Sequence, residues 1–233
     1  MSPDNTAALP LVHLVRPAEI EDGVKPPLLL LLHGIGSNER DLFSFANFLD
    51  PRCVVICVRA PIFYGGGGYS WFNVDLSSGK FRADETQVLS SLATLQKFIV
   101  GAIATYEADP RRVYIGGFSQ GGFMALLTGL SQPQNFAGIV SMSGRLTHEV
   151  ESFFGDRAAM EGLPIVMVHG IHDPVIPIAA ARETRDIVAK LPVDLDYHEF
   201  DMVHEVSLPS LETILTWLSV ELSNPWESPA QTN

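Results

Sequence analysis

The feature of this sequence that most limits its fold is a set of short, continuous apolar runs. A strand built from such a run is hydrophobic on both faces, and strands of that kind are typical of a parallel sheet covered by helices. We expect strands at LLLLL (28–32), CVVICV (53–58), VYI (113–115), GIVSM (138–142) and PIVMVHG (164–170). The alternating segment VDLDYHEF (193–200) predicts a last strand, and LVHLV (11–15) predicts an early edge strand.

Helical patterns lie between these strands. The clearest begins after Asp84, which is placed to cap the helix together with Gln87, and an apolar stripe with helical spacing follows. Two more helices are expected at about 178–191 and about 206–222, the second with Pro209 in its first turn. This alternation of strands and helices predicts an α/β fold with a mostly parallel central sheet and helices on both faces.

The composition fits a single domain, residues 11–222, between two loose tails, residues 1–10 and 223–233. The chain has 233 residues, of which 46% are hydrophobic and 18% are charged, and this is enough for one sizeable core. Its longest apolar run is far shorter than the roughly 18 residues that span a membrane. Its first residues have neither a basic start nor a long apolar core, so we expect no secretion signal and no stable membrane anchoring.

The net charge and the cysteine content limit which binding partners and which cellular compartment we expect. Acidic residues outnumber basic ones by 27 to 15, which gives a formal net charge of −12 and disfavours binding to nucleic acid. The two cysteines, Cys53 and Cys57, would share one face of a strand about 13 Å apart, beyond the reach of a disulfide. Reduced thiols indicate a cytoplasmic protein, and its expected partner is a small molecule. The oligomeric state is left open, with a homodimer as one option.

One strand ends in a motif that suggests nucleophilic chemistry. In VYIGGFSQGG (113–122), Ser119 stands among glycines directly after a strand and directly before an apolar stretch of helical character. Residues 117–121 (GFSQG) fit G-x-S-x-G, a sharp turn that exposes a nucleophilic serine and leaves no room for neighbouring side chains. A structural glycine turn without chemistry is the alternative, because so short a motif also arises by chance.

A serine hydroxyl needs a base and a carboxylate that orients the base. Serine hydrolases with this motif carry them in the chain order Ser, acid, His. We assign His204 as the base because it follows the last expected strand in a loop that can reach Ser119, with the in-strand His198 as the alternative. Asp173, in a proline-stiffened loop after the strand 164–170, is assigned as the acid. The alternatives Asp194, Asp196 and Asp201 are expected to be solvated charges on or after the last strand. The sequence therefore predicts a serine hydrolase.

Acyl transfer also needs hydrogen-bond donors for the developing oxyanion. Gln120, the residue after the nucleophile, supplies one backbone N–H group. Ile35, in the HGIG loop (33–36) that follows an early strand, is our candidate for the second donor. An ordinary glycine turn is the alternative interpretation of this loop.

The segment IFYGGGGYSWF (62–72) is expected to form one wall of the acyl pocket, lined by Phe63, Tyr69, Trp71 and Phe72. It follows a strand whose carboxyl edge faces the expected site, and mostly apolar walls suit an acyl chain. The glycine run within it would allow mobility. A small satellite core beneath a loop is the alternative. Because no long insertion follows the strands, we expect substrates with short to medium acyl chains.

Taken together, these segments resemble the small carboxylesterases, lysophospholipases and acyl-protein thioesterases of the α/β-hydrolase fold. The matching segments span roughly 28–222: LLLLLHGIGSNERDL, VRAPIF, GGYSWF, DPRRVYIGGFSQGG, SGR (143–145), HGIHDPVIP and the histidine of MVHEVS. The resemblance implies hydrolysis of esters or thioesters without a metal or other cofactor. It also implies a triad and an oxyanion hole, formed by Ser119, Asp173 and His204 and by Ile35 and Gln120.

The sequence departs from the family at one position. The family usually has glycine just before the histidine, whereas this chain has Val203. A branched residue does not adopt the backbone angles open to glycine. A different path for the His204 loop is therefore expected.

Several other interpretations compete with a serine hydrolase. The glycine run 65–68 lacks the lysine ending of a phosphate-binding loop, and a dinucleotide site would need a glycine where Glu39 stands. A metal hydrolase would use His169, His172 and Asp173, although an in-strand His169 would point into the core. The remaining alternative is a hydrolase fold that binds a small molecule without turning it over.

Overall fold

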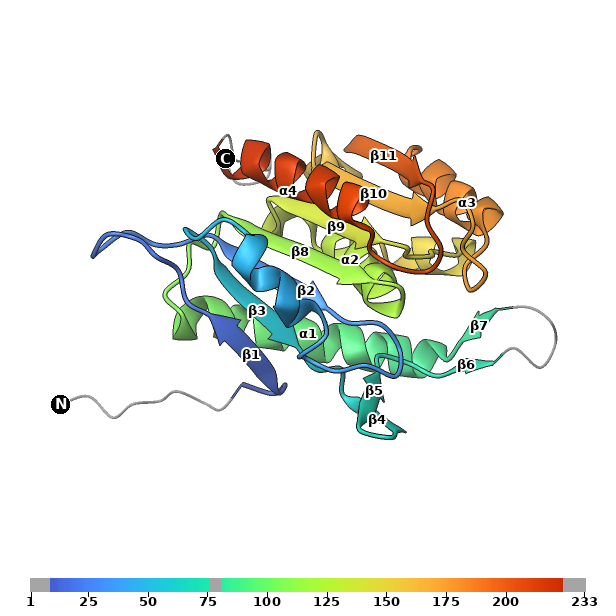
Figure 1. The fold of residues 1–233 in the computed structure, drawn as a ribbon, viewed down its shortest axis with the longest axis horizontal. Coiled ribbons are helices and arrows are strands. Elements are labelled where there is room, and N and C mark those ends of the chain that lie inside the picture. The colour runs from blue at the N-terminus through green and yellow to red at the C-terminus, as the bar shows by residue number, and fades with distance from the viewer. Residues whose placement is uncertain (1–8, 76–80, 224–233) are drawn as a thin grey trace.

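The structure is a computed structural model that describes residues 9–75 and 81–223 (Figure 1). The loose tails expected at 1–10 and 223–233 therefore lie almost entirely outside the described residues. Where those tails are described, Leu9 packs against the core beside Gly101, and Ser223 is the last residue of the final helix. The packed part of the chain thus extends slightly beyond the expected range of 11–222.

A seven-stranded sheet forms the centre of the molecule, with the strand order β1-β3-β2-β8-β9-β10-β11. Neighbouring strands are parallel except at one edge, where β1 pairs antiparallel with β3. The strands are β1 (His13–Arg16), β2 (Leu28–Leu32), β3 (Val54–Val58), β8 (Val113–Phe118), β9 (Gly138–Met142), β10 (Pro164–Gly170) and β11 (Asp194–Phe200). The mostly parallel sheet predicted from the apolar runs is confirmed.

Helices cover both faces of this sheet because each strand sends alternate apolar side chains to opposite sides (Figure 1). In β2, Leu28, Leu30 and Leu32 join the core on one face, and Leu29 and Leu31 join the core on the other. The first face carries α1 (Glu85–Thr105), α2 (Gln120–Ser131) and α3 (Ile178–Val188), and the second carries η1 (Leu42–Phe48) and α4 (Leu208–Ser223). η1 is a 3₁₀ helix, and three more complete the helices of the described residues: η2 (Pro133–Asn135), η3 (His148–Phe153) and η4 (Arg157–Met160).

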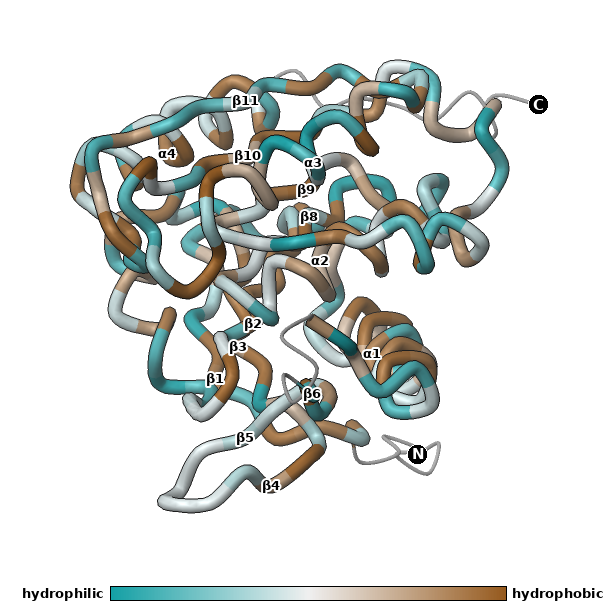
Figure 2. Tube along the Cα trace, turned by 90° about the vertical axis from the view of Figure 1, so that its right-hand side faces the viewer, coloured by the Kyte–Doolittle hydropathy of each residue, from teal (hydrophilic) through white to brown (hydrophobic). Residues whose placement is uncertain are grey.

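Local sequence sets the start of α1. Asp84 Oδ1 accepts a hydrogen bond from the backbone N–H of Gln87 at 3.1 Å, which is the cap predicted from the sequence. By length and composition alone, α1 is apolar enough to cross a membrane. Leu95 and Phe98 of its apolar stripe are nevertheless fully buried against the sheet, and Figure 2 shows hydrophobic residues both along the strands and along α1. In this fold α1 is a core helix.

Two small hairpins lie outside the predicted elements. β4 (Ile62–Gly65) pairs with β5 (Gly68–Ser70), and β6 (Val74–Asp75) pairs with β7 (Arg82–Ala83). Gly65, Gly66 and Gly67 have φ angles of 101°, 60° and 83°, which glycine adopts at little cost. The glycine run therefore serves as the tight turn of the first hairpin.

Both cysteines are free and buried. Cys57 lies in β3 and Cys53 directly precedes it, and both belong to the core beneath α4. Burial raises the pKa of each thiol to about 12. The thiols therefore stay protonated and unreactive near neutral pH.

Candidate active site

Ser119 lies in a strained turn between β8 and α2. Its φ of 55° and ψ of −116° are unusual for a residue other than glycine, and its N–H donates to the Met142 carbonyl of neighbouring β9 at 2.8 Å. A Cβ on Gly117 would lie 2.3 Å from the Gly121 carbonyl oxygen, and one on Gly121 would lie 2.0 Å from the Leu32 carbonyl oxygen. The crowding predicted from the G-x-S-x-G spacing is therefore present.

The structure brings Ser119, His204 and Asp173 together in one hydrogen-bonded chain. His204 Nε2 lies 2.9 Å from Ser119 Oγ, and His204 Nδ1 lies 2.6 Å from Asp173 Oδ2. Because a carboxylate only accepts hydrogen bonds, Nδ1 carries the proton and the lone pair of Nε2 faces the serine hydroxyl. This arrangement gives the serine a base and gives the base an orienting carboxylate.

Several donors hold the Asp173 carboxylate in place. Its Oδ1 accepts hydrogen bonds from the N–H groups of Val175 and Ile176, each at 2.8 Å. Its Oδ2 faces His204 and also lies 3.4 Å from Nε2 of the buried His169, which donates to the Ile176 carbonyl at 2.8 Å. Burial lowers the pKa of His169, which keeps its ring neutral. Sequence reasoning did not assign His169 this role, and only its four-residue spacing from Asp173 could have indicated it.

The loop that carries His204 reaches the site without a glycine before the histidine. Val203 does not adopt a positive φ. Gly170, the last residue of β10, leaves space for this loop. A Cβ on Gly170 would lie 2.3 Å from the Met202 carbonyl oxygen and 2.5 Å from the Val203 carbonyl oxygen. The ring of Phe118 then packs 4.8 Å from the His204 ring. The departure at Val203 therefore does not keep the histidine from the nucleophile.

The backbone N–H groups of Ile35 and Gln120 have no hydrogen-bond acceptor among the described residues. His33 Nδ1 binds the Gly34 carbonyl at 2.7 Å, and a trans peptide points its C=O and N–H in opposite directions, so the Ile35 N–H turns away from His33. His33 Nε2 accepts from the Ala60 N–H at 3.0 Å, and burial lowers the pKa of this ring. Gln120 begins α2, where the first N–H groups have no partner within the helix. Both N–H groups are thus available to an oxyanion.

The side chain of Gln120 has a structural role that sequence reasoning missed. Its Oε1 accepts a hydrogen bond from the Trp71 N–H at 2.7 Å, and its Nε2 donates to the Phe72 carbonyl at 2.6 Å. The indole Nε1–H of Trp71 donates in turn to the His33 carbonyl at 3.0 Å. This buried network ties the start of α2 to the HGIG loop. Its partners are far apart in the chain, so no local pattern indicates it.

The aromatic residues expected to line an acyl pocket do not form an open wall. Trp71 and Phe72 are 0% and 1% exposed and belong to the main core. The expectation was wrong for these two, because a side chain without accessible surface cannot line an open pocket. Tyr69 packs beneath the guanidinium of Arg59, and Phe63, which is 66% exposed, lies on the β4–β5 hairpin. The satellite-core alternative also fails, since Trp71 and Phe72 join the central core.

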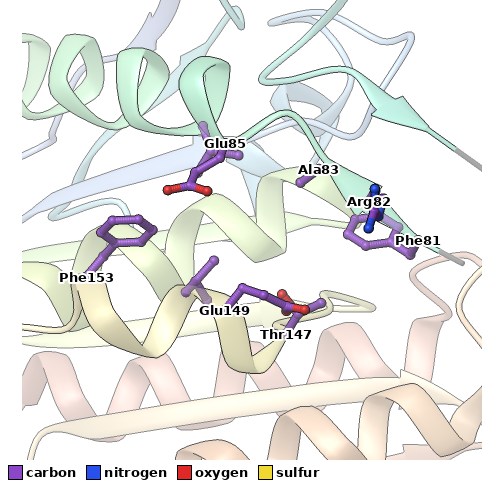
Figure 3. Close-up of a pocket in the computed structure, with 9 residues that line it drawn as sticks. Phe81, Arg82, Ala83, Glu85, Thr147, Glu149 and Phe153 are labelled. Carbon is purple, nitrogen blue, oxygen red and sulfur yellow. The ribbon is translucent and has the colours of Figure 1, made fainter.

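A cleft of about 310 Å³ lies between the start of α1 and η3 (Figure 3). Ser119, Asp173 and His204 do not line it. Its link to the site is the segment after β9, which carries the lining residue Thr147 and begins at Met142, the strand partner of Phe118 beside the nucleophile. Phe153 and Phe81 lie at its two ends in Figure 3. Its lining combines apolar side chains (Phe81, Ala83, Val88, Val150, Phe153) with polar ones (Arg82, Glu85, Thr147, Glu149). The cleft offers an acyl group a partly apolar surface.

The other histidines considered from the sequence lie elsewhere. His172 Nε2 pairs with Asp201 at the surface, 2.8 Å away, and does not join His169. His198, the alternative base, lies in β11 and pairs with Asp196. In the described part of the chain, no three His, Cys, Asp or Glu side chains are grouped as a metal ion would require.

The sequence and the fold of this chain are similar to those of known esterases and thioesterases. Residues 18–222 match the phospholipase/carboxylesterase family. Acyl-protein thioesterase 1 of Mycosarcoma maydis is 28% identical over 213 residues, which cover 80% of this chain and 88% of that protein. The putative hydrolase MhqD of Bacillus subtilis is 31% identical over 198 residues, covering 84% and 94% respectively. The crystal structure of esterase PE8 superposes with a TM-score of 0.76 at 27% identity, covering 90% of this chain and 98% of that one.

Proposed function

Because the chain belongs to the phospholipase/carboxylesterase family of the α/β-hydrolase fold, we propose that it is a serine hydrolase that cleaves carboxylic esters or thioesters. One observation carries this proposal. The hydrogen-bonded chain from Ser119 through His204 to Asp173 is accompanied by two backbone N–H groups that have no acceptor in the described residues. One belongs to Gln120, next to Ser119, and the other to Ile35, next to Gly34, on which a Cβ would lie 3.4 Å from Ser119 Cβ. Nucleophile, base, acid and oxyanion donors are the parts that acyl transfer needs.

In the first half of the reaction, Ser119 Oγ attacks the substrate carbonyl carbon and its proton passes to His204 Nε2. The carbonyl oxygen takes up the negative charge and accepts hydrogen bonds from the Ile35 and Gln120 N–H groups, and one such donor contributes about 3 kcal/mol in a well-studied protease. The intermediate collapses, the C–O or C–S bond breaks, and the alcohol or thiol leaves with the proton from His204. Asp173 stabilises the imidazolium throughout.

In the second half, water hydrolyses the acyl-enzyme. His204 Nε2 takes one proton from the water as its oxygen attacks the acyl carbon. Collapse of this second intermediate breaks the bond to Ser119 Oγ, which recovers the proton from His204. The carboxylic acid product then leaves, and the enzyme returns to its starting protonation state.

We place the acyl group in the cleft between α1 and η3, and we propose that it is short to medium in length. A volume of about 310 Å³ is at the lower end of the range for small-molecule sites. Each buried methylene is worth about 0.8 kcal/mol, so kcat/KM is expected to rise roughly fourfold per added carbon until the cleft is filled. A series of p-nitrophenyl esters from acetate to palmitate measures where the rise ends.

We also propose a cytoplasmic setting. The support is that Cys53 and Cys57 are both free and buried in the core. Proteins of oxidising compartments commonly use their cysteines in disulfides. In that setting the partner would be a small-molecule ester or thioester.

Covalent labelling with a fluorophosphonate tests the proposed function. This probe phosphonylates an activated serine, so we expect one label per chain on Ser119, located by mass spectrometry of the digested protein. Ser119→Ala should remove the label, and Ser207→Ala, a serine outside the triad, should keep it. A chain that stays unlabelled while a control esterase reacts would instead support a fold that binds small molecules without turning them over.

A further inference from the structure

Arg145 is a half-buried arginine whose side chain has no hydrogen bond or ion pair within the described residues, and its Nε atom is buried without a partner. Its guanidinium stacks on the ring of Phe81, 5.0 Å from the ring centre. Buried polar atoms in native proteins nearly always have a partner, so each exception needs an explanation. The need is stronger here, because the chain has 27 acidic residues and only 15 basic ones.

Acidic residues do lie close to Arg145 without pairing with it. Glu149 and Glu183 line, together with Arg145, a second cleft of about 390 Å³. This cleft adjoins the one proposed for the acyl group, because Phe81, Thr147 and Glu149 line both. A hydrogen bond with Thr147 holds the Glu149 carboxyl group and lowers its pKa. Among the described residues, the guanidinium of Arg145 is thus left with unused donors, and it lines this cleft.

The backbone around Arg145 lies beside the nucleophile. The carbonyl of Met142, three residues earlier, accepts the hydrogen bond from the Ser119 N–H at 2.8 Å. Gly144 lies against the first turn of α2, since a Cβ on Gly144 would come within 2.9 Å of the backbone of Gly122. Arg145 therefore follows directly on the segment that borders the active site.

The backbone of this segment is hydrogen-bonded to its neighbours and adopts an unusual conformation. Ser143 has a φ of 49°, and with Ser119 it is one of only three residues other than glycine that adopt a positive φ in the described part of the chain. Its N–H donates to the Val168 carbonyl at 2.9 Å, and the Leu146 N–H donates to Thr184 Oγ1 at 3.0 Å. Strain of this kind costs about 1–3 kcal/mol and clusters at functional sites. The backbone that carries Arg145 is therefore held on both sides, and stacking on Phe81 is the contact that orients its guanidinium.

Arg145 lies on the side of the active site where we expect the acyl group of the substrate, opposite the side of the leaving group. His204 stacks on Phe118, whose side chain packs with the core beneath α4. Phe81 and Leu146 instead pack with the core on the opposite face of the sheet, beneath α1 and α2. The leaving group must lie near His204 to receive its proton, so the acyl group extends the other way, toward Arg145.

We propose that Arg145 binds a carboxylate at the far end of the acyl group, so that the preferred substrates are half-esters or half-thioesters of dicarboxylic acids. This inference rests on the proposed serine hydrolase function. A single guanidinium offers paired donors that match one carboxylate. A phosphate dianion fits less well, because Glu149 and Glu183 line the same cleft and would repel its second charge.

The test compares two substrates that differ only in charge: p-nitrophenyl hydrogen adipate and its methyl ester, p-nitrophenyl methyl adipate. A hydrogen bond to a charged group is worth about tenfold to a hundredfold in affinity. We expect the free acid to have a kcat/KM at least about tenfold above that of the methyl ester, and salt to reduce this ratio. Half-esters of longer diacids, up to azelate, then locate the chain length at which the ratio is greatest.

Variants link the preference to Arg145. Arg145→Gln should bring the ratio of acid to methyl ester down to one or below, and Arg145→Lys, which keeps the charge without the planar fork, should retain part of it. Arg185→Gln is the matched control, because Arg185 also stacks on an aromatic ring, that of Tyr197, but is paired with Asp186. It should leave the ratio at the wild-type value.

Four outcomes would overturn the proposal while the proposed function stands, provided that the methyl ester is turned over. The first two are a wild-type ratio at or below one and a ratio unchanged in Arg145→Gln. The third is a higher rate for a p-nitrophenyl carboxylic ester whose acyl chain ends in a phosphonate in place of the carboxylate. The fourth is a preference that appears only when the carboxylate is on the leaving alcohol and not on the acyl chain. Absence of turnover of both esters together with absence of fluorophosphonate labelling would instead refute the proposed hydrolase function.

Discussion

Replacing Trp71 tests whether this residue belongs to the core or lines the substrate pocket. Its side chain is 0% exposed, and its indole N–H donates to the His33 carbonyl at 3.0 Å. Trp71→Ala should cost about 3–5 kcal/mol for the cavity, and about 1–3 kcal/mol more for a buried carbonyl left without a donor. Whole domains are stable by about 5–15 kcal/mol, so the alanine variant should retain little stability. Trp71→Phe keeps most of the volume, and its expected loss is close to the carbonyl contribution alone.

Activity should change together with stability. The His33 carbonyl belongs to the loop whose next residues place the Ile35 N–H, so Trp71→Phe is expected to lower kcat while KM stays nearly constant. Urea unfolding gives the free energy, and steady-state hydrolysis of p-nitrophenyl butyrate gives kcat and KM. Phe63→Ala is the control, because this aromatic residue of the same segment is 66% exposed and should change stability by no more than about 0.5 kcal/mol.

The reasoning would be refuted by a Trp71→Phe enzyme whose unfolding free energy stays within about 0.5 kcal/mol of wild type. A shift in the preferred acyl chain length at unchanged stability would go further, since it would place Trp71 in contact with substrate.

Three further predictions follow from the same geometry. Asp173→Asn should reduce kcat by about 10⁴-fold, as in the template triad, because the imidazole would be held in the wrong tautomer; a steady-state rate near wild type would assign the acid elsewhere. Gly121→Ala places a Cβ 2.0 Å from the Leu32 carbonyl oxygen, so soluble expression or labelling of the nucleophile should be lost, and a fully active variant would contradict the close approach. Burial lowers the pKa of His33 and of His169 below the ordinary value of 6.5, so the unfolded chain takes up protons first as the pH falls. The unfolding free energy from urea titrations should therefore decrease from pH 7 toward pH 5, and a constant value across that range would count against both buried rings.

The strands and the serine turn could be predicted from the sequence because short-range spacing encodes them. A run such as LLLLL at 28–32 is hydrophobic at every position, which suits a strand buried on both faces, and β2 occupies those residues. The glycines around Ser119 mark a turn in which a Cβ would strike the neighbouring backbone. The order of Ser119, Asp173 and His204 along the chain, together with the place of each one after an expected strand, selected three side chains that the structure brings into contact.

Tertiary structure alone decided what surrounds these residues. Trp71 and Phe72 are as apolar as any pocket wall, but they pack in the main core, where Gln120, 48 residues or more along the chain, binds their backbone. Val203 departs from the family pattern, and the space it needs is supplied by Gly170 on a neighbouring strand.

The charge pairing of Arg145 also depends on the tertiary structure. Its sequence neighbours do not reveal whether its guanidinium is paired, because that depends on which acidic side chains the fold brings within reach. Local spacing fixes backbone conformation residue by residue, whereas burial, pairing and cleft shape depend on long-range contacts that exist only once the sheet and its helices are packed together.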